Sequence, residues 1–138
     1  FLDQPDAQIM VNKIQSALDK EKKERIEYRE WLKDDIKAEF INGEIVMHSP
    51  VKRGHLEVTE NLFPLMRAYI AKHKLGTVSV EKALIGLTRN DYEPDICFFD
   101  KIKSQHFKKG QSLFPVPDFV VEVLSKSTKK ITTFQLVT

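Results

Sequence analysis

The sequence predicts a single-domain α/β or α+β fold in which a mixed sheet is flanked by helices. Three observations lead to this class. The chain starts with a long segment of helical character, continues with a turn signal typical of a β-hairpin, and ends in several strand-like runs. The length of 138 residues, with 41% hydrophobic and 30% charged residues, is ordinary for one globular domain.

Residues 8–33 predict one long helix with an interrupted apolar stripe. Val11, Ile14 and Leu18 begin the stripe, and a mixed-charge stretch at 19–25 breaks it. Such a helix is either solvent-exposed with i,i+4 ion pairs or an arm that pairs with a second chain. We therefore treat 1–33 as an N-terminal helical extension that adds little to the core and can form a homodimer contact, and 34–138 as the folded domain.

The spacing of apolar residues then changes from a helical to an extended pattern. Asn42-Gly43 lies between two β-prone runs, so residues 37–48 predict a hairpin, because both turn residues tolerate positive φ. Residues 54–73 return to helical spacing, and Pro64 predicts a kink or a split in that helix. Gly76 is expected to close it.

Strand-like runs fill the rest of the chain. Three of them are expected at 77–81, 83–88 and 95–99, with a loop at 102–115. The most apolar run is 119–124, which predicts the central strand of the sheet.

Composition limits the possible functions. There is no run of about 18 apolar residues, which excludes a predicted membrane span. The lone Cys97 allows no internal disulfide and is expected to be a buried thiol in a reduced, cytoplasmic protein. The net charge of +2 permits a nucleic-acid partner without arguing for one.

Two carboxylates stand out. Glu122 lies inside the apolar run 119–124, where an unpaired buried charge would cost several kcal/mol, so we expect a cation, a proton or a metal beside it. A strand-end Glu that faces solvent or pairs with Arg or Lys is the alternative. Asp95 follows Pro94 at a strand start, where it could simply cap a turn. If such carboxylates converge, they form a hard-oxygen site of the kind that holds Mg²⁺.

An ordered set of motifs carries a family resemblance over about residues 30–128. The motifs are Glu39-Phe40-Ile41-Asn42-Gly43-Glu44-Ile45-Val46-Met47-His48-Ser49-Pro50, Gly54-His55, Pro94-Asp95-Ile96 and Pro117-Asp118-Phe119-Val120-Val121-Glu122-Val123-Leu124-Ser125-Lys126-Ser127-Thr128. This set resembles the Uma-type family of restriction endonucleases, within the PD-(D/E)XK nuclease superfamily.

The resemblance implies a restriction-endonuclease-like core and a metal-dependent endonuclease that hydrolyses DNA phosphodiester bonds. It implies Mg²⁺ or Mn²⁺ ligation by Asp95 and Glu122, with Glu44 from the hairpin as a further acidic ligand and the backbone carbonyl of Val123 facing the metal. His55 could orient a phosphate or a water, or it could simply pack a helix start on the sheet.

The chain also departs from the superfamily pattern. The catalytic lysine of that pattern stands two residues after the glutamate, where this chain has Leu124. Lys126, Lys129 and Lys130 are the nearby replacements, and Lys126 stands where the family usually has Pro. The family's last helix and strand are expected to be truncated or unmatched here. The alternative function is therefore a catalytically impaired relative that binds DNA or protein, or an α/β scaffold without metal.

Overall fold

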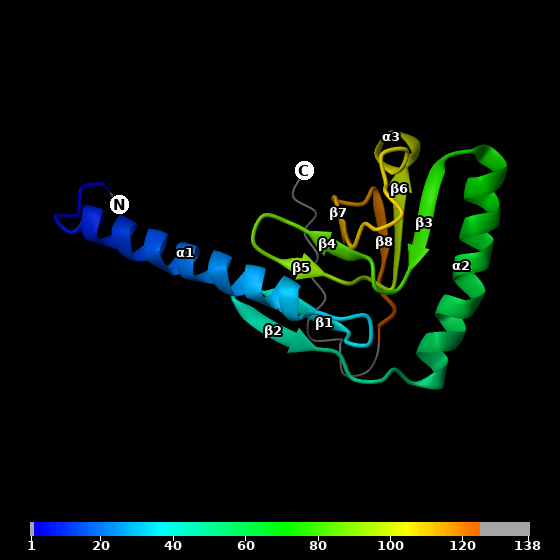
Figure 1. Ribbon diagram of the computed structural model, residues 1–138, viewed down its shortest axis with the longest axis horizontal. Helices are drawn as coiled ribbons and strands as arrows, with labels where there is room; N and C mark the ends of the chain where they lie inside the picture. The colour runs from blue at the N-terminus through cyan, green and yellow to red at the C-terminus, as the bar shows by residue number, and fades with distance from the viewer. Residues whose placement is uncertain (1, 125–138) are drawn as a thin grey trace. The chain divides into compact units, whose positions relative to one another are not determined.

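The computed structural model describes residues 2–124, which form two compact units (Figure 1). Residues up to 48 together with 86–92 make the first unit, and residues from 49 to 85 and from 93 onward make the second. The first unit contains α1 (Ala7–Trp31), β1 (Ala38–Ile41), β2 (Glu44–Met47) and β5 (Asp91–Tyr92). The second contains α2 (Arg53–His73), β3 (Gly76–Val80), β4 (Leu84–Gly86, whose last residue opens the 86–92 segment), β6 (Ile96–Asp100), α3 (Lys101–Ser104), β7 (Leu113–Phe114) and β8 (Phe119–Val121).

The predicted hairpin is confirmed in the first unit. β1 and β2 pair antiparallel, with Ile41 opposite Glu44. Asn42 and Gly43 have φ angles of 52° and 85°, so both turn residues adopt the left-handed conformation that a tight two-residue hairpin requires. β5 pairs antiparallel with β1 and completes a short three-stranded arrangement. The sequence analysis placed no strand at 91–92, so β5 was not predicted.

The long helix forms as predicted, but the expectation that it adds little to the core is wrong at its C-terminal end. Tyr28 is 1% exposed and packs with Ala38 and Phe40. Its hydroxyl donates to the carbonyl of Ala38 at 2.6 Å. The N-terminal half is exposed, with Ile14 60% accessible, as a helix with so narrow an apolar stripe should be. The division of the chain into 1–33 and 34–138 stays a prediction.

In the second unit, β3, β6 and β8 form an antiparallel sheet with β6 in the middle. The prediction that 119–124 is the central strand is wrong for the described part of the chain, where β8 lies at an edge and ends at Val121. Its apolar residues are only partly buried. The buried strand is β6, whose Cys97 and Phe99 are 1% and 0% exposed. β4 and β7 pair in parallel, so strand pairs of both senses occur.

Cys97 has the buried thiol that was expected. Burial raises the pKa of this thiol to about 11, which leaves it protonated and unreactive at neutral pH. It belongs to a core cluster with Ala83, Ile85 and Phe99.

α2 is one continuous helix that contains Pro64, so the predicted split does not occur. The helix ends at His73, and Lys74 caps it with a φ of 54°, in the left-handed region. The expected closing glycine comes two residues after this cap. Gly76 instead opens β3, where a side chain would collide with the carbonyl of Phe99. Among residues 2–124, no helix has the length and hydrophobicity needed to cross a membrane.

Candidate metal centre

Asp95 lies immediately before β6 and is only 3% exposed. Two backbone contacts hold it. Its carbonyl accepts the N–H of Glu81 at 3.0 Å, and its carboxylate Oδ2 accepts the N–H of Val123 at 2.8 Å. Asp95 therefore joins the end of β3 to the segment that follows β8, at one end of the antiparallel sheet.

Glu122 follows the last residue of β8. The register of β6 and β8 pairs Ile96 with Val121. Continued by one residue, this register sets Glu122 opposite Asp95. Opposite residues of an antiparallel pair project from the same face, with Cβ atoms roughly 4.5–5.5 Å apart. The expectation that Glu122 is buried is wrong, since its side chain is half-buried. An edge strand leaves one side of its terminal residue open to water.

His55 lies in the first turn of α2 and faces Asp95. Its Nε2 is 3.2 Å from Oδ1 of Asp95, and its side chain is 11% exposed. This nitrogen is buried and makes no hydrogen bond within residues 2–124, so the short approach lacks the geometry of a hydrogen bond. The structure thus brings together two residues that lie forty positions apart in the sequence.

The remaining predicted site residues are placed as follows. Glu44 is exposed at the start of β2 in the first unit, so its role as a ligand stays a prediction. The N–H of Val123 binds Asp95, and the proposed role of its carbonyl also stays a prediction. Lys126, with Lys129 and Lys130, lies outside the described residues. In the described part of the chain, no three His, Cys, Asp or Glu side chains are grouped closely enough to hold an ion by themselves.

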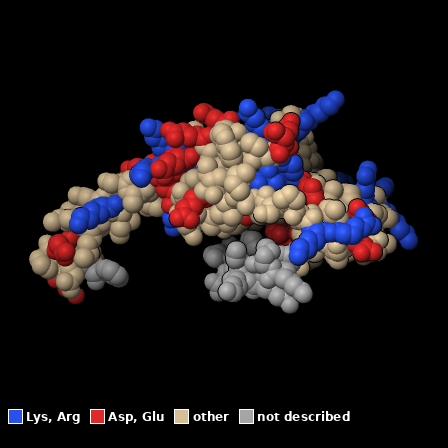
Figure 2. All heavy atoms as spheres, turned by 90° about the horizontal axis from the view of Figure 1, so that it is seen from below, with Lys and Arg blue, Asp and Glu red and all other residues tan. Residues whose placement is uncertain are grey.

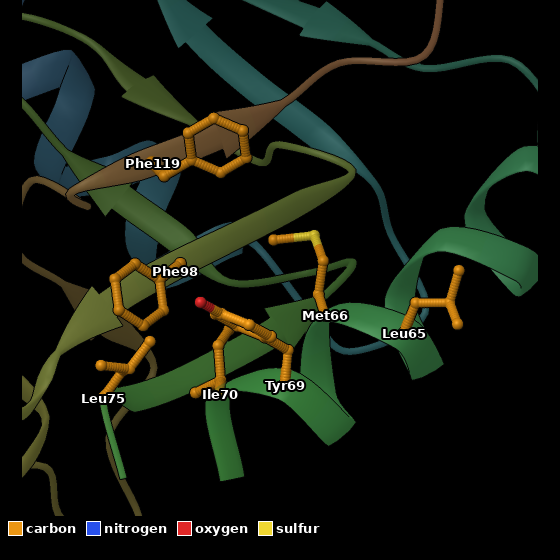
Figure 3. Close-up of a pocket in the computed structure, with 7 residues that line it drawn as sticks. All are labelled: Leu65, Met66, Tyr69, Ile70, Leu75, Phe98 and Phe119. Carbon is orange, nitrogen blue, oxygen red and sulfur yellow. The ribbon is translucent and has the colours of Figure 1, made fainter. Parts of the chain in front are cut away.

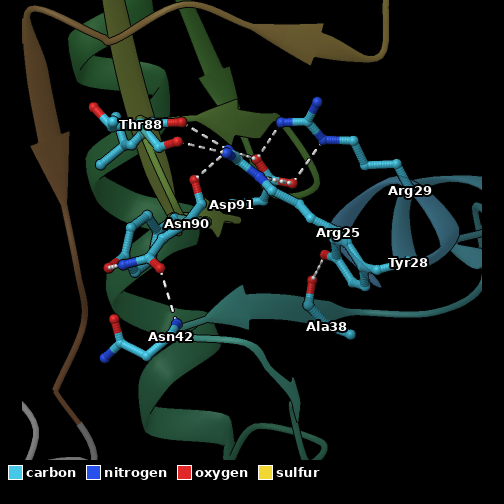
Figure 4. Close-up of polar contacts among 10 residues, drawn as sticks. Arg25, Tyr28, Arg29, Ala38, Asn42, Thr88, Asn90 and Asp91 are labelled. Carbon is cyan, nitrogen blue, oxygen red and sulfur yellow. Dashed lines mark hydrogen bonds and ion pairs between the residues drawn. The ribbon is translucent and has the colours of Figure 1, made fainter. Parts of the chain in front are cut away.

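Sequence analysis missed a buried carboxylate in the first unit. Asp91 is 0% exposed, and its carboxylate forms ion pairs with Arg25 and Arg29 of α1 (Figure 4). Nε of Arg29 lies 2.7 Å from Oδ2, and Nη2 of Arg29 lies 2.7 Å from Oδ1. Arg25 also donates to the carbonyls of Leu87, Thr88 and Asn90. The available signal was the four-residue spacing of the two arginines, which puts them on one helix face.

The charge of Asp91 is stabilised by these arginines. Burial alone would raise the pKa of Asp91, but hydrogen bonds from Arg29 and Arg25 outweigh it and lower the pKa below its usual value. The same pairing raises the pKa of Arg29. Since both carboxylate oxygens of Asp91 are bound by arginines of α1, this cluster attaches the helix to the 86–92 segment and is structural.

An apolar pocket lies between α2 and the sheet of the second unit (Figure 3). Met66, Tyr69 and Ile70 of α2 face Phe98 of β6 and Phe119 of β8. The pocket offers no carboxylate, so it supplies none of the ligands that phosphodiester chemistry needs.

Charged side chains differ between the two units. Acidic and basic residues are interspersed along α1 (Figure 2), and Asp and Glu outnumber Lys and Arg in the first unit. In the second unit, which contains Asp95, Lys and Arg outnumber Asp and Glu.

The fold is a mixed α/β fold with a long N-terminal helix, as predicted. A solved structure described as a "putative nuclease belonging to DUF820", from Anabaena variabilis, superposes with a TM-score of 0.63 at 16% sequence identity, over 72% of this chain and 57% of that one. This chain therefore spans a little over half the length of that relative. At this identity, the likeness is one of fold.

The Uma2 family, described as "Putative restriction endonuclease", matches residues 25–135. Because the match covers most of the chain, the protein belongs to this family, and the resemblance seen in the sequence is confirmed. No curated protein matches the chain. Family membership supports a nuclease, and restriction-endonuclease-like families generally use divalent metal ions.

Proposed function

We propose that the protein is a metal-dependent DNA endonuclease whose divalent cation is held by Asp95 and Glu122. The β6–β8 register supports this proposal, since its continuation by one residue would bring Glu122 opposite Asp95 at one end of the sheet. The buried state of Asp95 adds support, because a carboxylate that is 3% exposed gains from a cation beside it.

The residues fit a hard divalent cation. Mg²⁺ and Mn²⁺ are held by one or two carboxylates, while water and substrate oxygens fill the other positions. A bound ion would lower the pKa of a water and neutralise charge on the phosphodiester. The N–H of Val123 fixes one oxygen of Asp95, which orients the carboxylate before any ion arrives. Glu44 and the carbonyl of Val123 are further proposed ligands.

The candidate charge-stabilising lysines lie outside the described residues. We propose Lys126 for this role, with Lys129 or Lys130 as substitutes, because each lies within eight residues of Glu122 in the sequence. DNA is the proposed substrate and the cytoplasm the proposed location. If none of these lysines reaches the phosphodiester, the alternative function applies. The protein would then be a relative that binds DNA or a protein partner without cutting.

Nicking of supercoiled plasmid DNA with Mn²⁺ or Mg²⁺ tests the function. We expect weak nicking that Glu122→Gln abolishes, because the amide keeps the shape but removes the charge that holds the cation. Loss of one positioned electrostatic group typically lowers the rate roughly 10²–10³-fold. The matched control is Glu60→Gln on the exposed side of α2, which should nick as the parent does. Equal nicking by the parent and Glu122→Gln would remove Glu122 from the site.

We also propose that the exposed half of α1 mediates homodimerisation. Val11, Ile14 and Leu18 repeat at three- and four-residue spacing and are 54%, 60% and 38% exposed. Such a stripe can pair with its copy on a second helix. Ile14→Glu should convert the dimer to monomer in sedimentation experiments, whereas Lys13→Glu on the neighbouring position should not. A monomeric parent protein would contradict the proposal.

A further inference from the structure

We propose that His55 is a nitrogen ligand of the same cation and makes the site prefer Mn²⁺ to Mg²⁺. This inference rests on the proposed function, because it needs a cation at Asp95. It assigns His55 a coordinating role rather than the alternatives of packing a helix start or orienting a water.

The separation of the two side chains fits two ligands of one ion. Two donors that each lie about 2.1–2.2 Å from a metal, at a right angle, are roughly 3.0–3.1 Å apart. Nε2 of His55 and Oδ1 of Asp95 are 3.2 Å apart. Nε2 makes no hydrogen bond within the described chain, so its contact with Oδ1 is a close approach without hydrogen-bond geometry.

Both groups are held in place by the fold. His55 lies in the first turn of α2, where its N–H donates to the carbonyl of Lys52 at 2.9 Å. Its own carbonyl accepts the hydroxyl of Thr59, a residue that is 5% exposed, at 3.2 Å. Asp95 is fixed by the N–H of Val123. A site whose ligands are already positioned loses little entropy when an ion binds.

Coordination chemistry then determines which of the two ions the site prefers. Mg²⁺ takes oxygen ligands and gives up its water reluctantly, so an imidazole adds little to its binding. Transition-metal ions accept imidazole nitrogen together with carboxylate oxygen. One buried nitrogen beside Asp95 should therefore strengthen Mn²⁺ binding far more than Mg²⁺ binding.

Pulsed EPR of Mn²⁺ bound to the full chain tests the assignment directly. We expect nitrogen coupling from one imidazole in the parent protein, lost in His55→Gln and kept in His106→Gln, whose histidine is exposed. Calorimetry should show Mn²⁺ affinity falling at least about 10-fold in His55→Gln, with Mg²⁺ affinity changed by less than about 3-fold.

Two results would overturn the inference. One is a parent spectrum without nitrogen coupling, which does not depend on the folding of any variant. The other is unchanged Mn²⁺ affinity in folded His55→Gln. Asp95→Asn separates this inference from the proposed function. If Asp95→Asn loses Mn²⁺ while His55→Gln keeps it, the site stands without His55. If Asp95→Asn keeps it as well, the metal site itself is misplaced.

Discussion

Asp91→Ala is expected to lower the free energy of unfolding by about 3 kcal/mol or more, in the range seen when one partner of a buried ion pair is removed. Asp91 is 0% exposed, and the side chain of Arg25 is only 12% exposed. Without the carboxylate, Arg25 keeps its carbonyl acceptors in the 86–92 segment, but Arg29 loses both of its carboxylate contacts.

Urea unfolding of the full chain measures this loss. The matched control is Glu21→Ala, which removes a second contact between α1 and the same segment, the pair of Glu21 with Arg89. Arg89 is half-exposed, so water screens this pair and its removal should cost much less. Equal losses in the two variants would show that the buried cluster is not what attaches α1.

The direction of the Asp91 pKa shift determines how the contribution of this cluster to stability depends on pH. The folded protein lowers the pKa of Asp91 below its usual value of 3.8, so its charged form stabilises the native state above that value. This contribution is lost as the pH falls through the lowered pKa. The stability difference between the parent and Asp91→Ala should therefore be largest near neutrality and shrink below about pH 4.

The elements with strong local signals could be predicted from sequence. Asn42-Gly43 determined the hairpin because positive φ at both positions is a local requirement. The prediction that 119–124 is the central strand was wrong. Apolar composition does not distinguish a central strand from an edge strand, because an edge strand can also be apolar where it packs on a buried neighbour. The role of Asp91 was also missed, because its partners lie more than sixty residues earlier in the chain.

The candidate site shows the same limit. The family motifs pointed to Asp95, Glu122 and His55, but spacing alone could not show which of them meet. The antiparallel register, continued by one residue, sets Glu122 opposite Asp95, and α2 brings His55 to Asp95. Glu44 belongs to the other unit. A ligand set built from several elements depends on tertiary placement, which no local pattern encodes.

Asp95→Asn is expected to lower Mn²⁺ affinity roughly 100-fold or more, the largest functional effect of any single substitution. Asn keeps the size of the side chain and can still accept the N–H of Val123, so the link to the segment after β8 should persist. It removes the negative charge that a divalent ion requires. Plasmid nicking should be lost together with metal binding.

Calorimetric titration with Mn²⁺ measures the affinity, and thermal unfolding without metal confirms that the variant is folded. The matched control is Asp118→Asn in the same unit, because the carboxylate of Asp118 binds Lys103 and the N–H of Asp100 rather than the proposed site. Its Mn²⁺ affinity should equal that of the parent. A similar loss of Mn²⁺ affinity in both variants would show that binding depends on the total negative charge of the unit rather than on Asp95.

The most direct test of the metal site is the anomalous scattering of Mn²⁺ in crystals of the full chain. We predict one strong peak within about 2.0–2.3 Å of a carboxylate oxygen of Asp95 and of Glu122, the distances at which such ions are held. Crystals grown with saturating Mn²⁺ that show no peak between these two carboxylates, or show the ion bound only elsewhere, would contradict the proposal.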